Sequence, residues 1–243
     1  MAKIVLIGST SELGNATADK FLRKFPSHFT SILRIGRESG FSDITWQSRT
    51  YESNSVITAI NAAKIDKGDL IILAVGCLCE GVTFSNYQTL DLNKIVECIE
   101  ITGAMSALLL VSSIKSLSTA GGGSIVLFSS VASSPVLSSN LFYGSSKMYL
   151  EMIAQGFEPY LEKMNIRMSI VKPGFVSTKL NSHRTPTKFS TTTDKVANKI
   201  VRKFPNRVIY IPTFFRVITF FLNKSNLLRK IANATLEKSF KVN

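Results

Sequence analysis

The sequence predicts one α/β domain in which a parallel sheet is covered by helices on both faces. Short apolar runs alternate with helix-length stretches along most of the 243 residues, and the runs are continuously apolar where a half-exposed strand would alternate. Hydrophobic residues make up 45% of the chain, which is enough for a substantial core. These observations indicate a doubly wound, Rossmann-type fold. We expect it to occupy residues 1–212, with 213–243 as an aromatic and basic helical extension.

Each apolar run has the length of a strand and is followed by a segment that can hold a helix. In chain order, the strands are expected at KIVLIGS (3–9), SILRIG (31–36), LIILAVG (70–76), SIVLFSS (124–130), RMSIVKPG (167–174) and RVIYIP (207–212). The helices are expected at 12–25, 54–66, 88–118, 144–163 and 192–204. In such folds ligands bind outside the carboxyl ends of the strands, so the residues after each strand are the candidates for chemistry.

Composition narrows the classes of function. Cys77, Cys79 and Cys98 have the spacing of neither a disulfide framework nor a zinc site, and His28 and His183 have no companion ligands, so we expect a reducing cytoplasm and no metal. The first apolar run is too short for a signal peptide, and no run has the length of a bilayer span. The net charge of +13 favours an anionic partner. Without a nucleic-acid motif, a membrane surface or a phosphorylated small molecule is the better expectation.

The turn after the first strand reads GSTSELG and begins the first expected helix. Gly8 permits a tight turn and Gly14 permits close packing of the helix. The backbone amides of the four residues between them can meet a phosphate at the helix terminus; these are Thr10, Ser11, Glu12 and Leu13. A strand-to-helix turn also needs glycine for structural reasons alone, so the turn does not by itself establish a ligand.

Arg37 follows the second expected strand, where a dinucleotide-binding fold holds the adenosine ribose. A carboxylate at this place would bind the ribose diol, whereas an arginine can pair with a 2′-phosphate. The residue therefore favours NADPH over NADH, although Glu38 beside it weakens the preference.

A tyrosine and a lysine stand at the start of the helix expected near 144–163. Tyr143 and Lys147 are four residues apart, which places their side chains on one helical face. Ser130 ends a strand 13 residues before Tyr143. A neighbouring cation favours the ionised form of a phenol, which prepares it for proton transfer. The next strand leads into a further turn, which contains Pro173, Gly174, Val176 and Thr178.

With these four motifs in this order, the chain resembles the short-chain dehydrogenase/reductase family over nearly its whole length. The motifs are the glycine turn, the serine that ends a strand, the tyrosine–lysine pair and the turn that contains Pro173 and Thr178. The resemblance implies a dinucleotide-dependent enzyme that is a dimer or tetramer, with Tyr143 as proton donor in ketone reduction. It also implies that Ser130 donates a hydrogen bond to the substrate oxygen and that Lys147 binds the nicotinamide ribose. Val176 and Thr178 match the family residues that hold the nicotinamide carboxamide.

Three positions depart from the family pattern. Glu12 replaces a glycine of the phosphate-binding turn, and Ala74, Val75 and Gly76 stand where the family has Asn-Ala-Gly. Glu100 aligns with an asparagine that holds a water in the family's proton relay. It could join such a relay or be a partly buried acid without a catalytic role.

Within the family, the motifs are similar to the reductase half of the decaprenylphosphoryl-ribose 2-epimerase system. That resemblance implies a keto-sugar linked to phosphate and lipid, used in surface polysaccharide synthesis at the inner face of the membrane. The apolar segment from 214 to 222, bordered by arginines and lysines, then rests on the membrane, or packs in a dimer or against the core. The segment 179–194 is expected to be a lid over the cleft, with an ordinary flexible loop as the alternative. Alternative functions are reduction of a nucleotide-linked keto-sugar, reduction of acyl or steroid-like ketones, and dinucleotide-binding regulation without catalysis.

Overall fold

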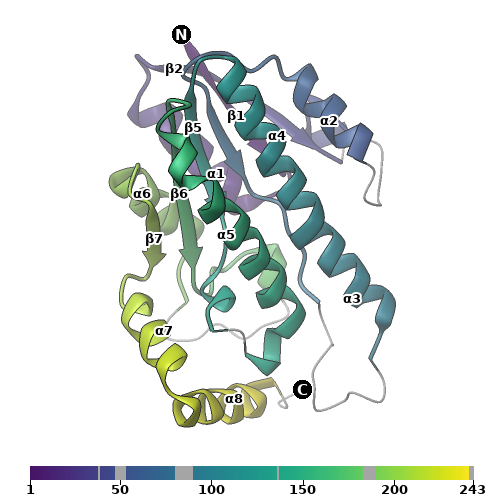
Figure 1. The fold of residues 1–243 in the computed structure, drawn as a ribbon, viewed down its shortest axis with the longest axis vertical. Coiled ribbons are helices and arrows are strands. Elements are labelled where there is room, and N and C mark those ends of the chain that lie inside the picture. The colour runs from purple at the N-terminus through teal and green to yellow at the C-terminus, as the bar shows by residue number, and fades with distance from the viewer. Residues whose placement is uncertain (38, 47–52, 80–89, 136, 183–189, 241–243) are drawn as a thin grey trace.

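The structure is a computed structural model that describes residues 1–37, 39–46, 53–79, 90–135, 137–182 and 190–240. Across these residues one parallel sheet has the strand order β3-β2-β1-β4-β5-β6-β7 (Figure 1). The strands are β1 (Ala2–Ile7), β2 (Phe29–Gly36), β3 (Ile44–Thr45), β4 (Leu70–Leu73), β5 (Gly123–Phe128), β6 (Ile166–Pro173) and β7 (Val208–Ile211). The predicted doubly wound fold in a single domain is confirmed.

Helices cover both faces of the sheet. They are α1 (Glu12–Lys24), α2 (Ser53–Ala62), α3 (Leu92–Cys98), α4 (Ser106–Thr119), α5 (Leu141–Leu161), α6 (Thr193–Lys203), α7 (Phe215–Lys224) and α8 (Asn226–Phe240). Between α3 and α4 the chain continues as a π-helix, Ile99–Met105. Short 3₁₀ turns lie at Ser39–Phe41, Val131–Ser133, Ser138–Asn140 and Lys179–Asn181.

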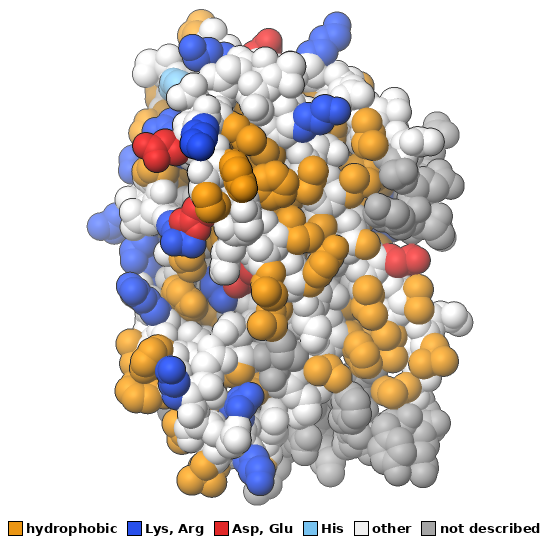
Figure 2. All heavy atoms as spheres, in the orientation of Figure 1, with side chains coloured by type: hydrophobic (Ala, Val, Ile, Leu, Met, Phe, Trp, Pro, Cys, Tyr) orange, Lys and Arg blue, Asp and Glu red, His pale blue; other side chains and the backbone are white. Residues whose placement is uncertain are grey.

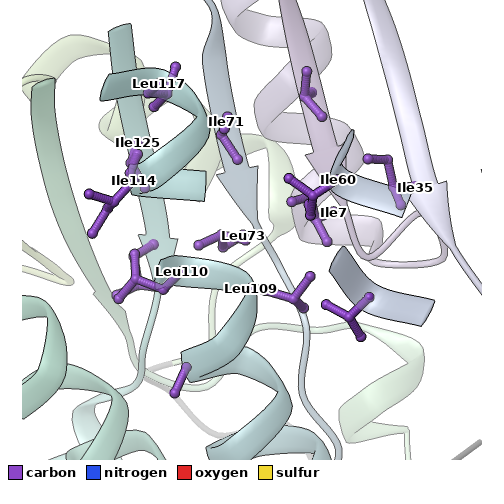
Figure 3. Close-up of a cluster of buried hydrophobic side chains, with 14 of the residues drawn as sticks. Ile7, Ile35, Ile60, Ile71, Leu73, Leu109, Leu110, Ile114, Leu117 and Ile125 are labelled. Carbon is purple, nitrogen blue, oxygen red and sulfur yellow. The ribbon is translucent and has the colours of Figure 1, made fainter. Parts of the chain in front are cut away.

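Two apolar cores explain why most strand residues are apolar on both faces of the sheet. Successive strand residues point to opposite faces, so Val5 and Ile7 of β1 join one core while Ile4 and Leu6 join the other. The first core is closed by α2, α4 and α5 (Figure 3), and the second by α1 and α6. All four residues of β4 are buried, as expected for a central strand.

The observed elements differ from the predicted ones at several ends. The two-residue strand β3 is too short to give a periodic pattern, and β4 ends at Leu73 because Ala74 to Gly76 turn away into the cleft. Helix α5 begins at Leu141, and residues 88 and 89 of the predicted helix 88–118 lie outside the described residues. The extension after 212 forms two helices, α7 and α8, with a break at Ser225.

One continuous helical stretch, Leu92–Thr119, is long and apolar enough to cross a membrane by length and composition. By length and composition, the expectation that no run could span a bilayer is therefore wrong. Over half of its most apolar window, 56%, is buried inside the molecule, where Leu109, Leu110 and Ile114 pack in the first core. Its apolar character is therefore explained by packing against the sheet.

Candidate active site

A cleft opens at the carboxyl ends of β1 and β4, where the strand order changes direction. Doubly wound folds bind their ligands at this switch point. The cavity has a volume of about 390 Å³. It is lined by most of the residues singled out from the sequence: Gly8, Thr10, Ser11, Glu12, Leu13, Arg37, Ala74, Val75, Gly76, Ser130, Tyr143, Lys147, Pro173, Gly174, Val176 and Thr178. Gly14 does not line it, because it lies under the turn against Leu6 and Ala74.

The turn after β1 is shaped by its glycines. Gly8 has a φ of +101°, and a Cβ there would lie 2.6 Å from the Ala74 carbonyl oxygen, so a side chain is excluded on two grounds. Ser11 caps α1 by accepting a hydrogen bond from the Gly14 amide at 3.0 Å. The amides of Glu12 and Leu13 precede the first closed turn of the helix and are directed to its open end, where an anion would bind.

The adenosine side of the cleft contains a residue that the sequence reasoning missed. Trp46 follows β3, is 4% exposed and lines the cavity beside Arg37. Its buried indole Nε1 has no hydrogen-bond partner among the described residues. A buried donor without a partner at this place fits a ligand that brings an acceptor. Together with the glycine turn and Arg37, it makes a donor set that fits a dinucleotide; Glu38 lies outside the described residues.

Ser130 follows β5 and begins the 3₁₀ turn Val131–Ser133. Its Oγ accepts a hydrogen bond from the Ala132 amide at 3.1 Å. An accepting hydroxyl keeps its own proton, so Ser130 remains able to donate to a substrate oxygen.

Lys147 lies between two strand ends and next to Tyr143. Its Nζ donates to the Val75 and Phe128 carbonyls at 3.0 and 2.9 Å, and it lies 5.9 Å from the centroid of the Tyr143 ring. Burial lowers the pKa of Lys147 to about 8, against the opposing influence of Cys77, Cys98 and Glu151. The lysine is thus held as a cation whose proton is unusually labile.

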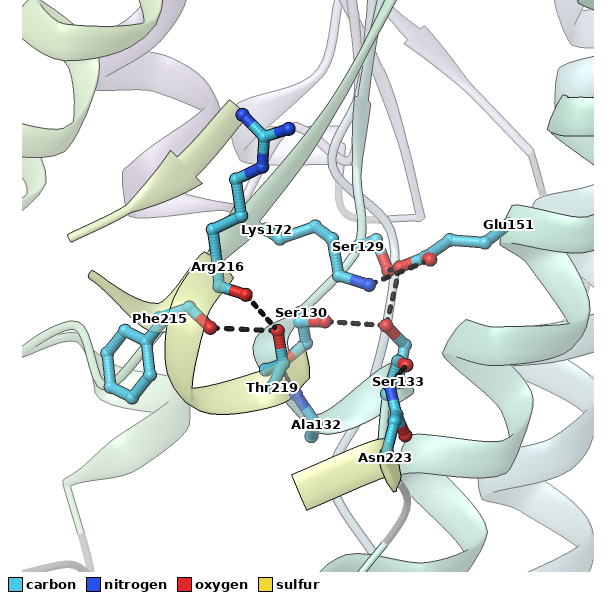
Figure 4. A network of polar contacts seen from close by, with 11 residues as sticks. Ser129, Ser130, Ala132, Ser133, Glu151, Lys172, Phe215, Arg216, Thr219 and Asn223 are labelled. Atoms are coloured by element: carbon cyan, nitrogen blue, oxygen red, sulfur yellow. Dashed lines mark hydrogen bonds and ion pairs between the residues drawn. The ribbon is translucent and has the colours of Figure 1, made fainter. Parts of the chain in front are cut away.

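A buried polar network, which the sequence did not reveal, holds the residues that flank Ser130 (Figure 4). Glu151 of α5 pairs with Lys172 of β6 at 2.9 Å, and both side chains are almost fully buried. The same carboxylate accepts hydrogen bonds from Ser129 and Ser133. Ser133 Oγ also lies 2.8 Å from the carbonyl oxygen of Ser130. The network therefore fixes the backbone on both sides of the serine hydroxyl.

The C-terminal helices pack against the same loop. Asn223 of α7 donates to Ser134 Oγ at 2.7 Å, and Asn233 of α8 accepts from the Ser138 amide at 3.1 Å. A Cβ on Gly174 would lie 2.5 Å from the Phe215 ring, so α7 also rests on the turn after β6. Figure 1 shows α7 and α8 beyond the carboxyl ends of the strands.

Of the residues that depart from the family pattern, Glu12 lies in the cleft and Glu100 does not. Glu12 reaches across the cleft, where its Oε2 accepts a hydrogen bond from the Lys179 amide at 2.7 Å. Glu100 does not line the cavity, whereas its π-helix neighbours Ile101 and Met105 do. Glu100 therefore places no carboxylate in this cleft for a proton relay. Of the expected lid, residues 183–189 lie outside the described residues.

The fold and the cleft are those of a dinucleotide-binding oxidoreductase, and a serine, a tyrosine and a lysine line the cleft. The family model described as short chain dehydrogenase matches residues 2–188, and the chain belongs to this family.

Comparisons with individual proteins give distant relatives. The chain is 40% identical over 100 residues to an uncharacterized oxidoreductase of Mycobacterium tuberculosis (strain ATCC 25618 / H37Rv), and this match spans 40% of each chain. It is similar to a short chain dehydrogenase from Burkholderia cenocepacia J2315 in complex with NADP, with a TM-score of 0.77, 15% identity and 97% of each chain covered. A short-chain dehydrogenase from Sphingobium yanoikuyae in complex with NADPH gives a TM-score of 0.71 at 18% identity, with 88% and 89% covered.

Proposed function

We propose that this short-chain dehydrogenase uses NADPH to reduce a ketone to a secondary alcohol. The observation that carries the proposal is that Ser130, Tyr143 and Lys147 line one cavity with the glycine turn after β1. A bound nicotinamide dinucleotide supplies the hydride. Arg37 at the end of β2 supports the phosphorylated form, as do the NADP and NADPH in the structures with similar folds.

The residues of the chain then supply the remaining chemistry. Ser130 Oγ–H donates to the ketone oxygen and stabilises the negative charge that develops on it. Tyr143 transfers its phenolic proton to the same oxygen as the alcohol forms. The Lys147 ammonium, 5.9 Å from the ring centroid, favours the phenolate that remains. In alcohol oxidation the same groups act in reverse.

Replacing Tyr143 by phenylalanine tests this assignment. We expect Tyr143→Phe to lower kcat by a factor of about 10² to 10⁴, since a general acid is lost, while NADPH affinity stays within a few-fold. Turnover is followed as NADPH oxidation with a panel of keto-sugars, acyl ketones and steroid-like ketones. Tyr160→Phe, an exposed tyrosine on the same helix, is the matched control.

The outcomes separate the candidate functions. Unchanged turnover in Tyr143→Phe would reject the tyrosine as the acid. NADPH binding without turnover of any ketone would instead favour a regulator without catalysis, and a preference for acyl or steroid-like ketones would favour the alternative reductase.

For the substrate we propose a keto-sugar linked through phosphate to a lipid, at the inner face of a membrane. Exposed apolar side chains at the start of α7, along α7 and on α8 support this; they are Phe214, Val217, Ile218, Phe220, Phe221, Leu227, Leu228 and Ile231. Figure 2 shows hydrophobic side chains beside lysines and arginines at the lower left, over α7. Between Asp194 and Glu237 the sequence has no acidic residue. An apolar and basic surface suits anionic lipid.

The position of this surface links it to catalysis. Asn223 and Asn233 attach α7 and α8 to the loop that follows Ser130. A substrate whose lipid stays in the membrane would therefore present its sugar next to the reaction centre.

Vesicle binding tests the membrane proposal. We expect the protein to bind phosphatidylglycerol vesicles and to prefer them to phosphatidylcholine vesicles, with binding that weakens at high salt. Phe220→Ser/Phe221→Ser, in which both positions are exposed, should reduce binding at least tenfold without loss of NADPH affinity. Equal partitioning of the full chain and a chain ending at residue 212 would contradict the proposal.

A homo-oligomer is proposed from a second exposed apolar face. Met148, Tyr149 and Met152 of α5 lie exposed, as does Val111 of α4. Soluble proteins seldom expose so many large apolar side chains together without a partner, and a second copy of the chain would cover them.

A further inference from the structure

Glu12 makes a contact that joins two distant parts of the cofactor cleft. Its Oε2 accepts a hydrogen bond from the backbone amide of Lys179 at 2.7 Å, and the two residues are 167 positions apart in the sequence. Both residues line the cavity. Glu12 is the first residue of α1, in the turn expected to hold the phosphates, and Lys179 follows Thr178 on the nicotinamide side. The hydrogen bond therefore crosses the cleft between the two halves of a bound dinucleotide.

The segment that carries Lys179 is fixed at its base. Val176 pairs with Thr191 in a β-bridge, and the Ser177 amide donates to the Thr191 carbonyl at 2.9 Å. Beyond this bridge, the 3₁₀ turn Lys179–Asn181 is tied back to Val176 through the Asn181 side chain at 3.0 Å. Among the described residues, Glu12 of α1 makes a hydrogen bond to this turn. Because both partners are exposed, water can replace the bond when the turn moves away.

We propose that Glu12 and the Lys179 amide form a latch that closes the cofactor cleft and must open each time the dinucleotide enters or leaves. This inference rests on the proposed function, since it assumes that the cleft binds NADPH. Closure by a side chain in the turn also gives Glu12 a role at a position where the family has glycine. Glu12 acts here as a gating residue and takes no part in hydride or proton transfer.

Two substitutions break the latch from opposite sides. Glu12→Gly removes the acceptor, and Glu12→Gln keeps an acceptor oxygen. Lys179→Pro removes the backbone donor, and Lys179→Ala removes the same side chain but keeps the donor. Proline suits this place, because Lys179 is the first residue of a helical turn and Thr178 has the extended conformation (φ −143°, ψ 166°) that proline requires before it.

Stopped-flow fluorescence of NADPH measures the rates of binding and release. We expect Glu12→Gly to raise both rates about tenfold, as the loss of one hydrogen bond predicts, with a smaller change in Kd. The rates of NADPH binding and release should be higher in Lys179→Pro than in Lys179→Ala by a similar factor. Both rates in Glu12→Gln should resemble those of the unmodified protein. The double variant Glu12→Gly/Lys179→Pro should be no faster than either single variant, because one contact is lost in each case.

Hydrogen exchange gives a readout that needs no cofactor. In the NADPH-free protein, the Lys179 amide should exchange about tenfold faster in Glu12→Gly than in Glu12→Gln. Equal exchange of the Lys179 amide in Glu12→Gly and Glu12→Gln, together with equal NADPH rates across the four single variants, would overturn the latch. A protein that binds no NADPH would overturn the proposed function, and the hydrogen-exchange comparison would still decide whether the contact holds the turn.

Discussion

At the scale of single residues, the site combines buried charges with backbone partners. Lys147 is 3% exposed, yet two carbonyl oxygens and the face of Tyr143 lie around its ammonium. Burial lowers its pKa to about 8 from 10.5 because the cation loses hydration. The same burial places the charge where it acts on the tyrosine through little solvent.

This pKa predicts a pH-dependent stability. Between pH 8 and 10.5 the unfolded chain holds a proton on Lys147 that the folded chain has released, so the free energy of unfolding rises with pH across this window. At about 1.36 kcal/mol per unit, the full rise is about 3 kcal/mol. Urea unfolding of the cofactor-free protein at several pH values should show this rise in the free energy of unfolding. The rise due to Lys147 should be absent from Lys147→Met. Parallel pH curves for the two proteins would contradict the shift.

Glu151 and Lys172 form the second buried pair, and their loss should be strongly non-additive. Lys172→Met leaves the buried Glu151 carboxylate without its cation, which should cost about 3–5 kcal/mol of unfolding free energy. Glu151→Leu/Lys172→Met, which removes both charges, should be less destabilised than the sum of the single changes. Because this network holds the backbone around Ser130, the single variant should also lower kcat more than it raises KM. Additive losses in denaturant unfolding would mean that the pair is not coupled.

At the scale of elements, the π-helix Ile99–Met105 is attached to the end of β4. The buried Thr102 hydroxyl accepts from the Cys77 amide and donates to the Cys77 carbonyl, each at 3.0 Å. Departures from regular helix often mark functional sites, and this one places Ile101 and Met105 on the cavity wall.

Substituting Thr102 tests the attachment. Thr102→Val leaves both backbone groups of Cys77 without their partner, which should cost about 1–3 kcal/mol of unfolding free energy. NADPH affinity should fall as well, because Val75 and Gly76 of the same segment line the cofactor cleft. Thr102→Ser keeps the hydroxyl and should restore most of both properties. If serine and valine behave alike in calorimetry and NADPH titration, the hydroxyl is not what holds the segment.

At the scale of the whole molecule, two of the exposed apolar regions among the described residues have different expected partners. The basic surface of α7 and α8 is proposed for anionic lipid, while the exposed face of α4 and α5 is proposed for a second copy of the chain. The distribution of lysine and arginine distinguishes the two, because a symmetric contact between like-charged surfaces is unfavourable.

Light scattering tests this division. Met148→Lys/Met152→Lys places cations on the α5 face at two exposed positions, and it should shift the protein from an oligomer towards the monomer by at least tenfold in dissociation constant. Vesicle binding through α7 and α8 should persist in this variant. Phe220→Ser/Phe221→Ser should behave in the opposite way, with its oligomeric state unchanged. An unmodified protein that is monomeric at all concentrations would refute the proposed oligomer.

The sequence by itself determined the order of most strands and helices and many of the residues that line the cleft. Strands buried on both faces are mostly apolar on both faces, so β1, β4, β5 and β6 are visible as nearly continuous apolar runs. The carboxyl ends of parallel strands lie at one edge of the sheet, so Gly8, Ser130 and Pro173 could be placed near one another from their positions after those runs. The spacing of four fixed Tyr143 and Lys147 on one face of α5.

Only the tertiary structure decided the contacts between segments that are far apart in the chain. The Glu151–Lys172 pair and the Glu12–Lys179 hydrogen bond each join elements whose sequences carry no mutual pattern. The place of Trp46 on the cavity wall likewise depends on packing. The place of Glu100 outside the cavity depends on the π-helix, which alters the register of side chains along α3 and α4. Local periodicity records which face of an element is buried, whereas the partner across the cleft is set by how the elements pack.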